Sequence, residues 1–286
     1  MPLPTNSPVT FGERAVTAGR ERGRLCVGID PHPHLLAAWG LSADVDGLRT
    51  FTMTCVEAFV GTAAMVKPQV AFFERYGSQG FAVLEEALAA LRENDCLSLA
   101  DAKRGDIGST MAGYAEAWLG ENSPLRADAV TVSPYLGVGA LSPVFDMAQD
   151  TGRGVFVLAA TSNPEAKALQ SLTVDGRSVA QRVVDELAER NAAVGAQADG
   201  NKSMVGALGV VVGATLDTPP KLDQLNGPVL LPGVGAQGAT PADVRALTNA
   251  APELGFANVS RAILSRGPKV ADLRKAVIET AAEFRD

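Results

Sequence analysis

Cysteine and histidine are scarce in this chain of 286 residues, and long apolar runs are absent. The three cysteines, Cys26, Cys55 and Cys96, are far apart and form no CxxC pair. This pattern excludes a disulfide framework and a cysteine zinc site, and it favours a reducing compartment. No stretch of about 18 apolar residues occurs, and residues 1–24 contain no apolar core typical of a signal peptide. We therefore expect a cytoplasmic protein that makes no contact with a membrane.

Basic residues are outnumbered by acidic ones. Lys and Arg total 25 and Asp and Glu total 32, so the formal net charge is −7. A chain of this charge has no general attraction for nucleic acid or anionic lipid, so any anionic ligand must be bound by a local group of cations. The two histidines, His32 and His34, have no acidic or histidine partners at ligand spacing, and we predict no metal site.

Eight short apolar runs alternate with longer amphipathic segments, a pattern typical of parallel strands joined by helices. The runs are almost continuously apolar, as expected of strands buried on both faces. They are Leu25–Asp30, Ala63–Gln69, Cys96–Lys103, Ala129–Pro134, Gly154–Ala160, Leu208–Thr215, Pro228–Gly233 and Phe256–Arg261. Eight strands predict a single closed (β/α)8 TIM barrel over residues 1–286 rather than an open sheet.

Helical patterns occur between the strands. Apolar residues at helical spacing predict helices over Gln79–Asn94 and Val270–Phe284. Thr240 as an N-cap and Pro241 in the first turn predict a helix that begins at Pro241. The regular spacing is interrupted after strand five, where we expect residues 161–207 to form an insertion. Its use as a lid, as an oligomer contact or as surface decoration stays open.

Charged residues gather where the predicted strands end. Strand one ends in Asp30, strand two carries Lys67, and strand three carries Asp101 and Lys103 with Asp106 just beyond. Asp101 and Lys103 share a face because side chains alternate along a strand. The active sites of barrels of this type lie at the carboxyl ends of the strands. The sequence therefore predicts an alternating group of Lys and Asp side chains there.

Burying such a group of charges costs free energy unless the charges are paired. Several buried charges at strand ends favour a functional role over a structural ion pair, because each is expensive to desolvate alone. Flanking carboxylates keep each lysine cationic, so its ammonium can donate a proton or stabilise a carbanion. This chemistry needs no metal.

Several stretches resemble one enzyme family over nearly the whole chain. They are LCVGIDPHP, MVKPQVAFFERYG, LADAKRGDIGST, VTVSPYLG, LLPGVGAQG and NVSRAIL. These stretches are similar to orotidine 5′-phosphate decarboxylase, in the long bacterial branch with an insertion after strand five. The DxKxxDI element from Asp101 to Ile107 is highly specific when joined to the upstream Asp30 and Lys67. The resemblance implies conversion of orotidine 5′-monophosphate to UMP and CO2 in de novo pyrimidine synthesis, without metal or cofactor.

The resemblance also implies roles in the reaction. Lys103 is expected to deliver the proton to C6 of the pyrimidine as CO2 leaves, and Asp101 to lie next to the departing carboxylate. Asp30 and Lys67 are expected to hold the ribose hydroxyls and to complete the charge array.

Three further matches concern a second subunit and the base. Asp106 resembles the family position that reaches across a dimer interface into the partner's active site, with Thr110 close behind it. Ser133 matches the serine that hydrogen-bonds the pyrimidine ring. The resemblance therefore implies a homodimer with shared active sites.

Two more matches concern the phosphate of the substrate. Gln237 and Arg261 match the phosphate-side residues of the family. The planar guanidinium of arginine suits a phosphate dianion, and barrels often bind phosphate after strands seven and eight. The chain departs from the pattern at Ser260, where shorter members commonly have glycine.

Three alternative interpretations are distinguishable. The run Gly233–Gly238 spells the dinucleotide fingerprint GxGxxG, but only 286 − 233 = 53 residues follow its first glycine, too few for the rest of that fold. A second interpretation is a sibling enzyme of the same superfamily, of the 3-keto-gulonate-phosphate decarboxylase or hexulose-phosphate synthase type. Such an enzyme would require Mg²⁺ for activity. A catalytically silent nucleotide-binding barrel would bind UMP tightly without turnover.

Overall fold

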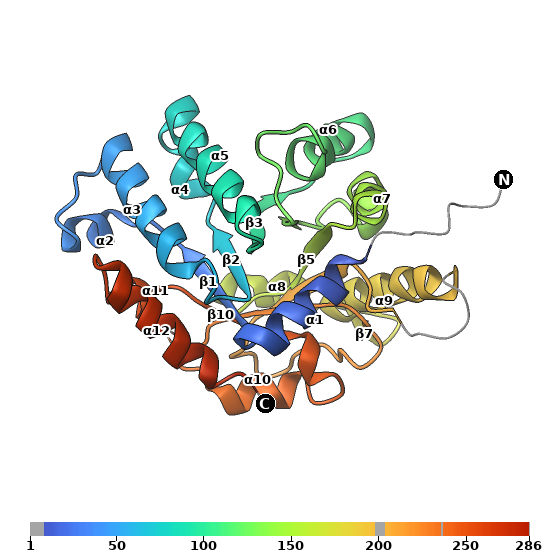
Figure 1. Ribbon diagram of the computed structural model, residues 1–286. Helices are drawn as coiled ribbons and strands as arrows, with labels where there is room; N and C mark the ends of the chain where they lie inside the picture. Colours follow the sequence, from blue (N-terminus) through green and yellow to red (C-terminus); the bar gives the residue numbers. More distant parts are fainter. Residues whose placement is uncertain (1–8, 198–203, 236, 286) are drawn as a thin grey trace.

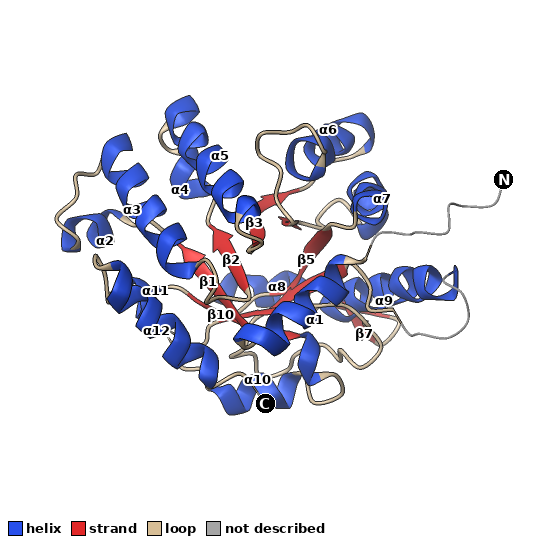
Figure 2. Cartoon of the chain, in the orientation of Figure 1, coloured by secondary structure: helices blue, strands red, loops and turns tan. Residues whose placement is uncertain are grey.

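A closed barrel of eight parallel strands forms the centre of the computed structural model, which describes residues 9–197, 204–235 and 237–285. The strands follow one another around the barrel in chain order, and the last closes against the first. They are β1 (Leu25–Ile29), β2 (Met65–Pro68), β3 (Leu97–Arg104), β4 (Ala129–Val132), β5 (Gly154–Ala160), β8 (Leu208–Val212), β9 (Val229–Pro232) and β10 (Gly255–Val259). The predicted (β/α)8 barrel is confirmed, with strands inside and helices outside (Figure 2).

Burial on both faces explains the apolar composition of the strands. Every residue of β1, β2, β4 and β8 is buried, because one face fills the barrel interior and the other lies under helices. Lys67 in β2 and Thr131 in β4 are the two residues with polar side chains in these four strands. Both belong to the site described below.

Helices surround the strands (Figure 1). They are α1 (Phe11–Arg22), α2 (Pro33–Ala38), α3 (Val45–Phe59), α4 (Ala71–Glu74), α5 (Gly77–Glu93), α6 (Gly108–Leu119), α7 (Ser142–Thr151), α8 (Lys167–Gln170), α9 (Val179–Gln197), α10 (Pro241–Leu247), α11 (Arg261–Leu264) and α12 (Val270–Ala282). The helices predicted over 79–94 and 270–284 are observed as α5 and α12. None of the described helices combines the length and the apolar character needed to cross a bilayer.

The start of α10 agrees with the prediction. The Thr240 hydroxyl accepts a hydrogen bond from the backbone N–H of Asp243 at 3.3 Å. The Asp243 carboxylate in turn accepts one from the Thr240 backbone N–H at 2.8 Å. This reciprocal capping box satisfies two N–H groups that would otherwise lack partners, and the helix begins at Pro241.

α1 closes the amino-terminal end of the barrel. The Phe11 side chain is fully buried and packs edge-on against Phe156 of β5, with ring centroids 5.8 Å apart. Gly154 leaves the room for this ring, because a Cβ there would overlap it. Arg14 of α1 also pairs with Asp128 ahead of β4. Figure 1 shows α1 lying across the strands.

The segment between β5 and β8 is longer than a single crossover helix requires. α9 contacts both strands and takes the place of the crossover helix. Ahead of it lie α8 and a small antiparallel hairpin of β6 (Thr173–Val174) and β7 (Arg177–Ser178). The segment 161–207 expected as an insertion thus includes the barrel's own helix, and the added part precedes residue 179. Residues 198–203 of this segment lie outside the described residues.

Candidate active site

Four charged side chains alternate in sign at the carboxyl ends of β1, β2 and β3. Asp30 follows β1, Lys67 lies in β2, and Asp101 and Lys103 lie in β3. The Lys67 ammonium is 2.9 Å from Asp101 Oδ2 and 3.9 Å from Asp30 Oδ1. The Lys103 ammonium is 2.6 Å from Asp101 Oδ1. The structure therefore brings these four predicted residues together, and we call them the charged cluster.

Two neutral side chains complete the environment of Asp101. The Thr131 hydroxyl donates to Asp101 Oδ1 and the Gln69 amide donates to Oδ2, each at 2.9 Å. Thr131 also accepts the backbone N–H of Lys103 at 2.9 Å. Neither Thr131 nor Gln69 was predicted from the sequence. The sequence carried a signal for each of them. Thr131 is a polar residue inside an apolar run, and Gln69 lies two residues after Lys67, on the same face of the predicted strand.

β3 is irregular where it carries the cluster. Ala100 pairs with Val130 and Arg104 pairs with Val132, so four steps along β3 match two along β4. A bulge of this kind redirects side chains and recurs beside active sites. Lys103 lies inside it with a φ of 49°, a left-handed conformation uncommon for a residue with a side chain. The bulge and Thr131 together hold the Lys103 backbone beside Asp101.

Opposite charges outweigh burial in this cluster. Burial alone would raise the pKa of Asp101, but the ammonium groups of Lys67 and Lys103 and their hydrogen bonds hold it well below its usual range. Burial opposes the charge of Lys67, whereas Asp101 and Asp30 raise its pKa above the ordinary lysine value. Asp101 therefore stays anionic and Lys67 cationic across the neutral pH range.

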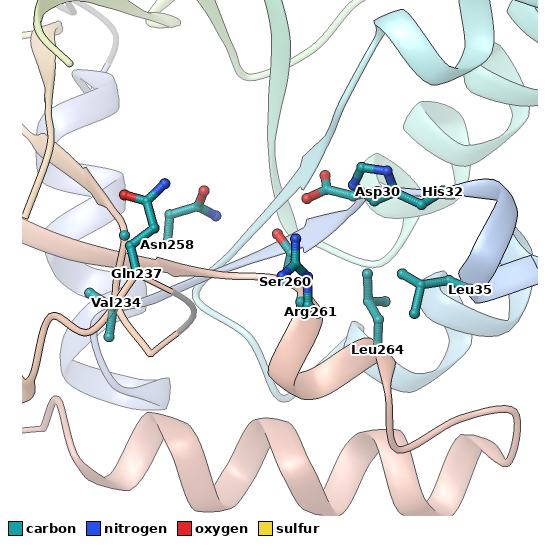
Figure 3. A pocket seen from close by; sticks show the side chains of 10 residues that line it. Asp30, His32, Leu35, Val234, Gln237, Asn258, Ser260, Arg261 and Leu264 are labelled. Atoms are coloured by element: carbon teal, nitrogen blue, oxygen red, sulfur yellow. The ribbon is translucent and has the colours of Figure 1, made fainter. Parts of the chain in front are cut away.

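Two cavities meet at Asp30 and His32, which line both. The lysine cavity, about 410 Å³, is also lined by Gln69, Ala71, Phe72, Glu74, Asp101, Ala102 and Lys103. The arginine cavity, about 140 Å³, is also lined by Leu35, Gly233, Val234, Gln237, Asn258, Ser260, Arg261 and Leu264. Figure 3 shows Asp30 and His32 on one side of the arginine cavity and Gln237 on the other, with Arg261 between them. The predicted phosphate-side residues therefore lie together, next to the charged cluster.

The loop after β9 forms one wall of the arginine cavity. Gly233 and Gly235 have φ values of 104° and 71°, which only glycine adopts without strain. Gln237 Oε1 accepts a hydrogen bond from the Ser162 hydroxyl, which follows β5, at 2.8 Å. Ser162 was not predicted as a site residue. Ala236 of the GxGxxG run lies outside the described residues.

The remaining predicted residues do not line either cavity. Asp106 and Thr110 lie on the segment after β3, and the Asp106 carboxylate accepts the backbone N–H of Ile107 at 2.8 Å. Ser133 follows β4 and its backbone N–H donates to the Arg104 carbonyl at 2.7 Å. Within the described residues of a single chain, these three side chains line neither the lysine cavity nor the arginine cavity.

The histidine pair packs with aromatic rings. The His32 ring lies 4.3 Å from the Phe72 centroid and 5.1 Å from that of His34. Over residues 9–197, 204–235 and 237–285, no group of three His, Cys, Asp or Glu side chains is arranged to hold a metal ion.

Comparison with known proteins agrees with this geometry. The model of the orotidine 5′-phosphate decarboxylase / HUMPS family matches residues 23–276. Orotidine 5′-phosphate decarboxylase of Corynebacterium efficiens is 61% identical, covering 96% of this chain and 97% of that protein. The enzyme of the same name from Salinispora arenicola is 55% identical, covering 96% and 97%. The crystal structure of a Streptomyces avermitilis protein assigned as orotidine 5′-phosphate decarboxylase superimposes with a TM-score of 0.91 at 50% identity, covering 100% of this chain and 98% of that one.

The barrel fold and the charged cluster together define the class of protein. A (β/α)8 barrel with a charged cluster at the carboxyl ends of its strands is an enzyme barrel. The chain belongs to the orotidine 5′-phosphate decarboxylase / HUMPS family, whose model covers most of its length. It is a carboxy-lyase by this membership.

Proposed function

We propose that the chain converts orotidine 5′-monophosphate to UMP and CO2, the last step of de novo pyrimidine synthesis, without metal or cofactor. The observation that carries the proposal is the charged cluster, with the Lys103 ammonium 2.6 Å from Asp101 in a cavity that opens beside it. High identity to curated decarboxylases over nearly the full chain supports the same substrate.

In the proposed reaction the bond between C6 and the carboxylate breaks, and CO2 leaves. The electron pair stays at C6, where the Lys103 ammonium stabilises it and then supplies a proton. Lys103 recovers its proton from solvent, which its half-exposed side chain can reach. Asp101, held anionic by two lysines, accepts a hydrogen bond from this ammonium and keeps it in place.

Binding energy from the phosphate serves the reaction in this scheme. Arg261 and Gln237 line the arginine cavity and would hold the phosphate, while Asp30, on the wall shared by both cavities, would hold the ribose. The base then lies in the lysine cavity against the charged cluster. Interactions with a distant phosphate can position the reacting atoms, so a substrate that lacks phosphate should lose turnover as well as affinity.

The proposal includes a cytoplasmic homodimer with shared active sites. Three large apolar side chains are exposed just after β3 and β4, with Ile107 60%, Tyr135 78% and Leu136 54% accessible. An exposed apolar group of this kind suits a protein interface. Asp106 and Thr110 lie beside Ile107 and would enter the partner's site, and Ser133 would bind the base once the substrate is present. The free buried thiols fit a reducing cytoplasm.

The proposal is tested by the loss of orotidine 5′-monophosphate absorbance with purified protein in excess EDTA. We expect rapid loss with the wild-type chain and none above background with Lys103→Ala. Lys275→Ala is the matched control, because Lys275 is exposed and, among the described residues, pairs only with Glu279 on α12. Activity on a sugar phosphate only after Mg²⁺ addition would instead identify the sibling enzyme. Tight UMP binding without turnover would identify a silent barrel.

A further inference from the structure

Asp30 has a charged neighbour but an unfilled hydrogen-bonding position. Its Oδ1 atom is buried and has no hydrogen-bond partner among the described residues. The Lys67 ammonium lies 3.9 Å away, which is too far for a hydrogen bond. A buried carboxylate oxygen without a donor is costly, so a donor is expected when the site is filled.

Ser260 presents an unused hydroxyl at the same place. It precedes α11, where a serine side chain commonly caps a helix, but here it makes no capping hydrogen bond. No hydrogen bond of the described residues involves its Oγ atom, and the side chain lines the arginine cavity beside Arg261. Figure 3 shows Ser260 and Asp30 at this cavity.

Gly28 makes room for the serine side chain. Val27 of β1 pairs with Val259 of β10, so Gly28 and Ser260 follow at neighbouring positions of adjacent strands. A Cβ built on Gly28 would overlap the Ser260 hydroxyl oxygen and would lie 3.2 Å from Asp30 Oδ1. The two oxygens therefore border the same small space, which exists because residue 28 has no side chain.

We propose that Ser260 is a further substrate-binding residue: its hydroxyl donates a hydrogen bond to Asp30 Oδ1 and accepts one from a sugar hydroxyl of the bound nucleotide. The inference rests on the proposed function for the identity of the nucleotide. A serine hydroxyl has one donor and two acceptor positions, so it can make both bonds at once. Ser260 lies between the residue assigned to the ribose and the residue assigned to the phosphate, where the sugar must pass.

The test measures binding of UMP, 2′-deoxy-UMP and 3′-deoxy-UMP by calorimetry to wild type and Ser260→Ala. Loss of one hydrogen bond should weaken UMP binding by about tenfold. The loss should vanish for the deoxy ligand that lacks the hydroxyl bound by Ser260. An equal loss for UMP and both deoxy ligands would overturn the proposal, as would no loss for any of them. Ser265→Ala, which removes a hydroxyl that donates to the Ala262 carbonyl and has no other partner among the described residues, should bind all three ligands like wild type.

A second comparison separates binding from folding. Gly28→Ala should lower the melting temperature because its methyl group overlaps Ser260, and the double variant Gly28→Ala with Ser260→Gly should recover it. The double variant should still bind UMP about tenfold more weakly than wild type, since the hydroxyl is gone. Wild-type affinity in a recovered double variant would overturn the role of Ser260. Failure of the wild-type protein to decarboxylate orotidine 5′-monophosphate would instead refute the proposed function. The absorbance assay detects this failure independently of the binding measurements.

Discussion

Asp101 is the residue on which the charged cluster depends. Its two oxygens accept from Lys67, Lys103, Gln69 and Thr131, so the carboxylate is surrounded by donors. Such a carboxylate needs no reorganisation when charge changes nearby, because its partners are already oriented. Thr131 links this carboxylate to the Lys103 backbone and is 1% exposed.

Thr131→Val tests that link. The change keeps the side-chain shape but removes the donor to Asp101 and the acceptor for the Lys103 N–H. We expect the unfolding free energy to fall by about 1–3 kcal/mol, the usual cost of unsatisfied buried polar groups. A comparable loss at the transition state would lower kcat by about 10- to 100-fold. Stopped or continuous decarboxylation assays measure kcat, and Thr131→Ser should retain most of it; an inactive Thr131→Ser would argue against the hydroxyl.

At the scale of elements, β3 is bulged where it carries the charged cluster. Its last residue, Arg104, pairs with Glu74 of α4 and lies 5.6 Å from the Trp118 ring of α6. These contacts secure the chain on the far side of the bulge. Lys103 is thus held between the strand interior and an anchored arginine.

α1 provides the opposite case, an element that stabilises without touching the site. Phe11→Ala should lower the unfolding free energy by about 3–5 kcal/mol, because a fully buried ring is replaced by a cavity. Denaturant titration measures this loss, and kcat per folded molecule should stay at the wild-type value. Val9→Ala is the control, since Val9 is 61% exposed and its truncation should change stability by less than about 0.5 kcal/mol. A large fall in kcat for folded Phe11→Ala would contradict this separation.

The elements differ in how far the sequence predicts them. Apolar runs indicated every barrel strand, because both faces of each are buried, and the Thr240 cap indicated where α10 begins. The bulge at Lys103 was not predicted, since it depends on pairing with β4 rather than on local pattern. Ser162 was missed for a similar reason: its partner Gln237 is 75 residues away. The residues of α9 were assigned to the insertion because the hairpin ahead of them makes the segment between β5 and β8 longer than a single crossover helix needs.

At the scale of the whole molecule, α1 closes the amino-terminal end of the barrel and the charged cluster lies at the opposite end. The proposed homodimer adds a second chain at the carboxyl ends of the strands, where Asp106 lines neither the lysine cavity nor the arginine cavity of its own chain. If sites are shared, mixing Lys103→Ala with Asp106→Ala chains should restore about one quarter of wild-type activity. Half of the dimers would be hybrids, and each hybrid would have one intact site. No recovery after demonstrated subunit exchange would rule out shared sites.

The shared wall of the two cavities has a consequence for inhibitor chemistry. Asp30 and His32 border both spaces, so an anionic ring in the larger space and a phosphate mimic in the smaller one would lie on either side of the same two residues. Two weak fragments joined by a short tether past these side chains gain from effective concentration, by about 10²- to 10⁴-fold when the tether matches the span.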